Sequence, residues 1–236
     1  LQQRAAGAMP LRAVSAAAMK GHFESRQALQ EWLSRAAGEH HTCLDAALHN
    51  ARRALALCPL AGEGYLYLGE LCFLEGGRGP AKAAYLEQAV RVRPFSGKVL
   101  FEAGRETLLA GDYRQGLELW RRAFRAGKVY QAQILQGLAG RIRPGNPEEE
   151  IQFLLDTFQP GLYALRILNT TYSNLAAPER LTTLRRRYAQ AAEAEAAGAP
   201  GKPAGALWLE AMQLYSQLRE ITHAIQCGRE GLDCDP

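Results

Sequence analysis

A histidine-rich segment, His40-His41-Thr42-Cys43, with His49 further along, is the first place where the residue types could hold a metal. Metal-binding helices usually place their ligands four residues apart, and other sites use short closed loops. His40 and His41 are adjacent and point apart on a helix, and no second cysteine lies nearby. We therefore expect a loop or an N-terminal helical turn here, and no zinc site.

The residues that could act as nucleophiles, acids or phosphate ligands lack the arrangement that such chemistry needs. No GxSxG sequence occurs. The carboxylates of Glu148–Glu150 follow Asn146-Pro147, which predicts the N-cap and first turn of a helix. Negative charges at that end complement the helix dipole, so they need no catalytic explanation. The run Gly76-Gly-Arg-Gly79 is followed by proline and lacks the GK[ST] ending of a phosphate loop. The sequence thus predicts no active site and no cofactor.

Basic residues gather in two helical segments, around Arg121, Arg122 and Arg125, and at Arg180 with Arg185–Arg187. The net charge is only +4, and Tyr188 is the one aromatic residue near the second group. Nucleic-acid binding needs a denser basic surface with stacking aromatics. We expect these residues to form solvated helix faces. A surface for an acidic partner is the next alternative, and a nucleic-acid site is the last.

The 236 residues are 47% apolar and 22% charged, which is typical of a globular protein and not of a disordered one. No run of about 18 apolar residues predicts a membrane span. The 5 cysteines form no CxxC pair, and most are expected to be buried as small apolar residues. Because the chain begins at Leu1 and ends at Pro236, directly after a predicted helix, we expect it to belong to a longer protein.

The elements that carry these residues are predicted to be helices throughout. Leu29, Trp32 and Leu33 lie on one helix face, and Gly/Pro breaks recur after about a dozen residues. Strand-like alternation is nearly absent, so the predicted class is all-α. The alanine-rich run 189–198 is predicted to be the solvated end of a long helix.

Small residues and prolines recur with a period of 34–35 residues. Three sets share it: Ala54, Ala89 and Ala123; Pro59 and Pro94; Gly69 and Gly104. Antiparallel helices approach closely only where a side chain is nearly absent, so these alanines and glycines are predicted at helix crossings.

The segment Tyr65-x-x-Leu68-Gly69-x-x-Cys72 resembles the first helix of the tetratricopeptide repeat (TPR) family, with Cys72 in a position where the family has an aromatic residue. Similar spacings follow at Leu100, Ala103, Gly104 and Thr107, and at Trp208, Ala211, Met212 and Tyr215. In the last repeat Gly228 replaces a large aromatic residue, which predicts loose packing. The resemblance implies a right-handed solenoid of helical hairpins.

The predicted organisation has four parts: an N-terminal helical segment (1–23), TPR-like repeats (24–126), degenerate helical hairpins (127–203) and a C-terminal TPR-like repeat (204–236).

In the TPR family, peptides bind a concave groove lined by first helices, so the resemblance implies a set of partner-binding positions. These are Glu63, Leu66, Tyr67, Glu70 and Phe73 in one repeat, and Lys98, Phe101, Glu102, Arg105 and Leu108 in the next. The chaperone-binding members hold a terminal carboxylate with basic and amide side chains. Lys98 and Arg105 fit that role, whereas Glu63 and Glu70 argue against it. The alternative for Tyr67 and Phe73 is that they belong to the core between repeats.

A looser resemblance links residues 57–71, 90–94 and 117–124 to the soluble repeat tails of bacterial O-antigen ligase-like membrane proteins. Two functions therefore stay open. The first is a non-enzymatic scaffold that binds a protein or peptide. The alternative is an accessory domain of a cell-envelope polysaccharide enzyme, whose catalytic part would lie outside this chain.

Overall fold

The computed structural model describes residues 11–21, 23, 25–75, 81–141, 145–199 and 201–234. Every regular element in these ranges is a helix, and none is a strand. The chain divides into two compact units, residues 1–123 and 124–236. The all-α class predicted from the sequence is confirmed.

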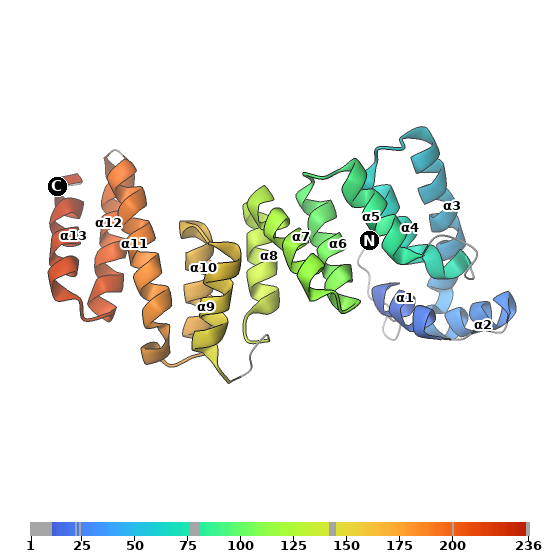
Figure 1. Cartoon of the computed structure of the whole chain (residues 1–236), viewed down its shortest axis with the longest axis horizontal. Coiled ribbons are helices and arrows are strands. Elements are labelled where there is room, and N and C mark those ends of the chain that lie inside the picture. Colours follow the sequence, from blue (N-terminus) through green and yellow to red (C-terminus); the bar gives the residue numbers. More distant parts are fainter. Residues whose placement is uncertain are drawn as a thin grey trace. The chain divides into compact units, whose positions relative to one another are not determined.

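The first unit is a succession of helices, each packed against its neighbour in the chain (Figure 1). Its elements are α1 (Leu11–Lys20), α2 (Arg26–Ala37), η1 (Gly38–His41), α3 (Thr42–Leu57), α4 (Gly62–Leu71), η2 (Cys72–Glu75), α5 (Lys82–Val92), α6 (Gly97–Leu109) and α7 (Tyr113–Ala126), whose last turn enters the second unit. Helix α4 contacts α3, α5 and α6, and the short turns that join α3 to α4, α5 to α6 and α6 to α7 make each of these pairs antiparallel. These are the stacked helical hairpins that the sequence predicts.

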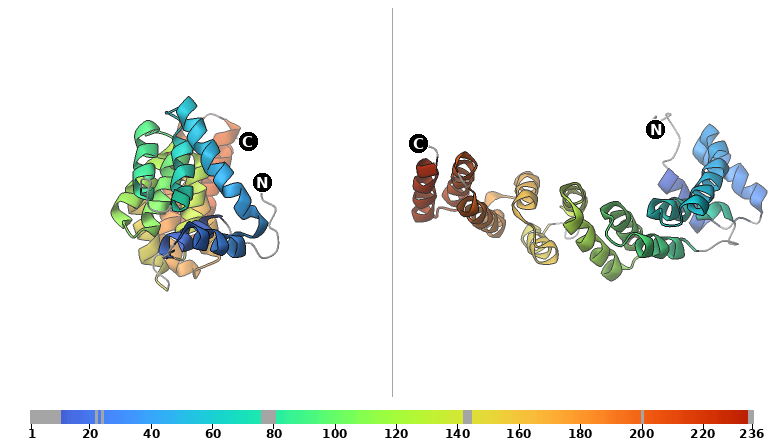
Figure 2. Two further views of the ribbon diagram at one scale, coloured as in Figure 1. Left: turned by 90° about the vertical axis from the view of Figure 1, so that its right-hand side faces the viewer. Right: turned by 90° about the horizontal axis from the view of Figure 1, so that it is seen from above.

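The second unit repeats this architecture. It contains α8 (Lys128–Leu138), α9 (Pro147–Phe158), α10 (Leu162–Ser173), η3 (Pro178–Leu181), α11 (Thr182–Gly198), α12 (Lys202–Gln217) and α13 (Ile221–Cys234). Helix α10 packs against α8 and α11, α11 packs against α12, and α12 packs against α13. The right-hand view of Figure 2 shows the helices of each unit following one another in chain order.

Side-chain caps explain where several helices begin. The Ser25 hydroxyl accepts a hydrogen bond from the Ala28 amide at 3.1 Å, and Asp112 accepts one from the Gln115 amide at 3.0 Å. The predicted N-cap of α9 is confirmed, since the Asn146 side chain accepts from the Glu149 amide at 3.4 Å. Each cap satisfies an amide that would otherwise have no partner in the first helical turn.

The periodic glycines lie where helices cross, and the two helices approach more closely at one crossing than at the other. A Cβ atom on Gly104 would lie 2.5 Å from Trp120 Cδ1 and 3.0 Å from the Gly116 carbonyl oxygen, so α6 and α7 are in direct backbone contact. A Cβ atom on Gly69, one period earlier, would lie 3.5 Å from Tyr85 Cβ, an ordinary contact distance. The predicted close approach is therefore confirmed and is tightest at Gly104.

Three packing predictions are wrong. Ala54 is exposed, because α3 turns Ala51 and Leu55 inward instead, whereas Ala89 and Ala123 are buried as expected. The alanine-rich end of α11 is a packed face, since Ala189, Ala192 and Ala196 are buried beside α12. The position of Gly228 is not loose, because the Met212 sulfur fills the space in front of it.

Candidate functional site

The partner-binding positions implied by the TPR resemblance lie on α4 and α6, which contact each other in the first unit. Helix α4 carries the first group of residues, Glu63, Leu66, Tyr67 and Glu70. Helix α6 carries the second group, Lys98, Phe101, Glu102 and Arg105. We call the surface formed by the exposed Glu63, Tyr67 and Lys98 and the partly buried Glu102 the α4–α6 face.

An ion pair joins the two helices across this face. Lys98 Nζ lies 2.5 Å from Glu63 Oε2, and both side chains are about half exposed. The hydrogen bond to Glu63 is the main cause that raises the pKa of Lys98, and Tyr67 and Glu102 act in the same direction. Lys98 is therefore paired with a carboxylate of the neighbouring repeat, and a terminal carboxylate of a partner would have to compete with Glu63 for it.

Other members of the predicted set belong to the core. Leu66 is buried against Ala89 and Val99. Phe101 stacks on Trp120, with 5.8 Å between ring centroids, and the Trp120 indole donates to the Phe101 carbonyl oxygen at 2.9 Å. Phe73 is buried in the main cluster of this unit, as the alternative reading of that residue predicts. Leu66 and Phe73 are thus buried, whereas Phe101 stays partly exposed beside the face.

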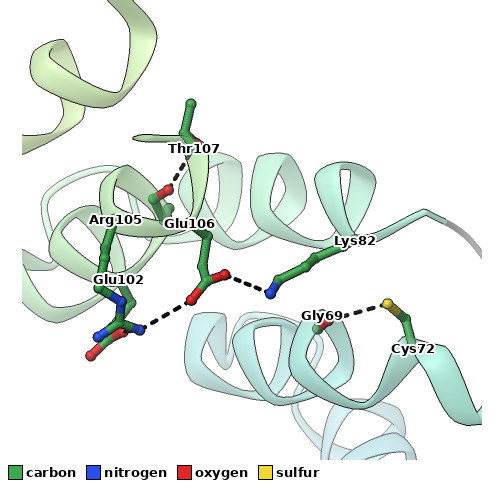
Figure 3. A network of polar contacts seen from close by, with 8 residues as sticks. Gly69, Cys72, Lys82, Glu102, Arg105, Glu106 and Thr107 are labelled. Atoms are coloured by element: carbon green, nitrogen blue, oxygen red, sulfur yellow. Dashed lines mark hydrogen bonds and ion pairs between the residues drawn. The ribbon is translucent and has the colours of Figure 1, made fainter. Parts of the chain in front are cut away.

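Beside the face, a chain of charged groups links α5 to α6 (Figure 3). Lys82 Nζ lies 2.5 Å from Glu106 Oε2, and Arg105 binds both Glu106 and Glu102. Burial alone would raise the pKa of the Glu106 carboxyl, but the hydrogen bonds and charges of Lys82 and Arg105 outweigh it and lower the pKa. Lys82 and Glu106 are not recognisable as a pair from the sequence, because their 24-residue separation matches no repeat spacing.

Tyr67 is the member of the set that presents an aromatic ring to solvent, with 50% of its surface exposed. Its alternative assignment to the core between repeats is therefore wrong. Glu70 lies one turn further along α4 and is only partly exposed.

The second unit contains a comparable polar network, whose members no sequence pattern indicates. Arg166 on α10 binds Glu210 on α12 through two nitrogens, and the Tyr188 hydroxyl donates to the same carboxylate. Burial, followed by the hydrogen bond to Glu210, raises the pKa of Tyr188 to about 12. Arg186, from the run predicted to be solvated, binds Glu220 at 2.7 Å. Arg185 of the same run is partly buried, so that prediction is wrong for it.

A shallow hollow of about 420 Å³ also lies within the second unit, between the end of α9 and the middle of α11. Its lining residues are Leu155, Gln159, Pro160, Leu165, Arg187, Gln190 and Ala191. Its polar side chains are Gln159, Arg187 and Gln190, and none of its lining residues is a carboxylate, histidine, serine or cysteine.

The segment first considered for metal binding forms the short helix η1 and the start of α3. His41 Nδ1 lies 2.7 Å from the Gly38 carbonyl oxygen, and Cys43 is exposed. Among the described residues, no three His, Cys, Asp or Glu side chains are grouped as metal ligands. No helix in the same ranges is both long and apolar enough to cross a bilayer.

The cysteines divide by exposure, which corrects the prediction that most are buried. Cys72 and Cys227 are buried, Cys43 and Cys58 are exposed, and Cys234 is intermediate. Burial is the main cause that raises the pKa of the Cys72 and Cys227 thiols.

We expect Cys43 and Cys58 to be alkylated about 100-fold faster than Cys72 and Cys227 in the folded protein, since the thiolate is the reactive form and must be accessible. Peptide mass spectrometry after timed iodoacetamide treatment at pH 8, with and without urea, measures this. Equal labelling of Cys58 and Cys72 without urea would contradict the packing around η2.

Comparison with known proteins gives only a distant structural similarity. No protein-family model matches the sequence, and no curated protein is significantly similar to it. One similar solved structure is described as "Crystal structure of APC/C hetero-tetramer Cut9-Hcn1", with a TM-score of 0.37 and 15% sequence identity. The match covers 95% of this chain but 43% of that one, so this chain spans less than half the length of the structure it matches. So remote a similarity carries no argument about function, and the helical-hairpin architecture rests on the packing described above.

Proposed function

We propose that this chain is a protein-interaction scaffold, and that the α4–α6 face binds a peptide or a segment of a partner protein. The observation that carries the proposal is the half-exposed Tyr67 ring standing beside the Glu63–Lys98 ion pair. Tyrosine is enriched among the residues that dominate binding energy at interfaces, because one rigid side chain offers both apolar area and a hydroxyl.

The charged groups around Tyr67 are held in place before binding. Lys98 is fixed by Glu63, and Glu102 is fixed by Arg105, which Glu106 also binds. Side chains that are already ordered lose less conformational entropy on association. Because both signs of charge are present, we expect a partner with an apolar anchor for Tyr67 flanked by charged or polar residues, and not a purely acidic tail.

Selection from a random-peptide display library, followed by fluorescence-polarisation titration of the selected peptides, tests this function. Tyr67→Ala is expected to weaken binding about 30-fold, the effect of losing a central interface aromatic. Tyr113→Ala is the matched control, because that tyrosine is 70% exposed in the same unit but lies at the α6–α7 turn. Selected peptides that bind the Tyr67→Ala and wild-type chains equally would refute the role of this face.

The alternative of an accessory domain in a cell-envelope polysaccharide enzyme stays a prediction, which the helix packing does not test. The four-part division of the chain predicted from the sequence is likewise a proposal. In that proposal, residues 127–203 are degenerate hairpins of the same type.

A further inference from the structure

Two turns of the first unit present large apolar side chains to solvent at one edge of the helix stack. Leu57 and Leu60 flank the α3–α4 turn with 81% and 62% of their surface exposed, and Phe95 in the α5–α6 turn is 90% exposed. Figure 1 shows these two turns at the same edge and the α6–α7 turn at the opposite edge. We call residues 57–60 and 93–96 the turn edge.

The turn edge is ordered by specific hydrogen bonds. Arg93 Nε donates to the Leu60 carbonyl oxygen at 2.9 Å, which ties the two turns together. Arg122 Nη2 donates to the Pro94 carbonyl oxygen at 2.7 Å. The apolar side chains are therefore displayed on a fixed backbone, and their exposure does not come from a loose loop. A cluster of exposed large apolar groups indicates a surface that is covered in the functional state.

The repeat itself places these residues. Leu60 and Phe95 are 35 residues apart, and each follows the proline that ends a second helix, Pro59 or Pro94. Equivalent positions in successive repeats therefore present an apolar side chain at the same edge.

The charges around the turn edge are predominantly positive. The turn edge itself contains no carboxylate, and two on the adjoining helices already have cationic partners: Glu63 binds Lys98 and Glu87 binds Arg91. Arg53, one helical turn before Leu57, has no carboxylate partner among the described residues, and Arg93 and Arg122 bind only backbone carbonyls there.

We propose that the turn edge docks on an anionic lipid surface. Leu57, Leu60 and Phe95 enter the boundary between headgroups and acyl chains, while the arginines contact lipid phosphates. This combination of protruding apolar groups and basic residues is the one that binds interfacial segments to membranes. A lipid surface is favoured over a protein groove because the three side chains project outward on two separate turns, and a fluid interface accepts them without preformed pockets.

The exposed Cys58 lies inside the turn edge and provides a site for an environment-sensitive fluorophore. The label is attached to Cys58 in the Cys43→Ser, Cys234→Ser chain, and vesicles of phosphatidylcholine with about one third phosphatidylglycerol are added. We expect a blue shift and an increase in intensity that fall as salt screens the headgroup charge. The same label on Cys43, in the Cys58→Ser, Cys234→Ser chain, is expected to show no blue shift.

Vesicle co-sedimentation of the unlabelled chain supplies the mutational test. Phe95→Ser is expected to lower the partition coefficient about 10-fold, in line with losing one inserted aromatic side chain. Leu109→Ser is the matched control, since Leu109 is 75% exposed but lies at the opposite end of α6. Leu109→Ser is expected to leave the partition coefficient unchanged.

Three outcomes would overturn the proposal. The first is undetectable binding to the anionic vesicles, or binding that Phe95→Ser leaves unchanged. The second is a dimer in light scattering that Phe95→Ser abolishes, which would assign the turn edge to a second copy of the chain. The third is that the wild-type chain does not bind vesicles and that Phe95→Ser abolishes binding of a peptide selected from the display library. That result would assign the turn edge to a protein partner. A failure of the Tyr67 experiment leaves this proposal intact, because the α4–α6 face and the turn edge are tested by different variants and probes.

Discussion

Glu150→Ala is expected to lower the free energy of unfolding of the second unit by about 3–4 kcal/mol, since it removes two charge-assisted hydrogen bonds from a buried site. Glu150 is 1% exposed although it lies in the first turn of α9. Its carboxylate oxygens accept from the amides of Gly140 and Arg141, each at 3.1 Å. The side chain thus joins the start of α9 to the end of the α8 segment.

The surroundings of Glu150 explain why no simple replacement is neutral. Burial, and then the nearby Glu150 carboxylate, raise the pKa of the Tyr172 hydroxyl, which is itself fully buried. Alanine would leave a void beside this hydroxyl and remove the acceptor of two amides. Glu150→Gln keeps the side-chain volume but places its NH2 group opposite one of the two backbone N–H groups. We therefore expect the free energy of unfolding to fall by a smaller amount, about 1–2 kcal/mol.

Urea unfolding followed by circular dichroism, with hydrogen exchange of α9 as the local readout, measures the effect. Glu148→Ala is the control, because that residue lies in the same helical turn and is exposed. We expect the control to lose less than about 1 kcal/mol, the contribution of an exposed carboxylate to the helix dipole. Equal losses for the two variants would show that Glu150 acts only through the dipole.

Gly104→Ala is expected to destabilise the first unit by about 2–3 kcal/mol through overpacking. The new Cβ atom would lie 2.5 Å from Trp120 Cδ1 and 3.0 Å from the Gly116 carbonyl oxygen. The Trp120 ring is held by its stack on Phe101 and by the hydrogen bond to the Phe101 carbonyl, so it cannot move without losing both. Helices α6 and α7 would have to separate.

Gly69→Ala is a stringent control because it is the same substitution at the equivalent position of the preceding repeat. Its Cβ atom would meet Tyr85 Cβ at 3.5 Å, so no neighbour has to shift. We expect this variant to be as stable as the wild type or more stable by up to about 1 kcal/mol, the helix-propensity gain of alanine over glycine. Thermal and urea denaturation measure the stability of both variants relative to the wild type. Equal changes in stability for Gly104→Ala and Gly69→Ala would contradict the closer helix approach described at Gly104.

The sequence predicted the architecture well because it depends on local and periodic signals. Gly/Pro breaks and the apolar spacing of residues such as Leu29 and Leu33 are enough to identify helices, and both leucines are buried. Asn146 identified a helix start because capping involves residues only three positions apart. The predicted rotation of individual helices was less accurate, as exposed Ala54 and buried Ala189 show. Alanine is compatible with either environment, so its type does not indicate its neighbours.

The candidate site was predicted in part. The resemblance pointed to α4 and α6, and it included Tyr67, the exposed aromatic on which the proposed binding depends. It also included Leu66 and Phe101, which the fold buries or stacks in the core. Residue type cannot separate these cases, because an aromatic or leucine on a repeat helix has the same spacing whether it faces the next repeat or solvent.

By itself, the sequence determined an all-α chain of helical hairpins with a period of 34–35 residues, because helix formation, capping and small-residue crossings are encoded over short distances. Only the tertiary structure decided the state of the charged groups. It paired Lys98 with Glu63, buried Glu150 under two backbone amides, and left Leu57 and Phe95 exposed beside arginines that bind backbone carbonyls. Burial and charge pairing depend on residues distant in sequence that folding brings within a few ångströms, where desolvation and Coulomb energies become large.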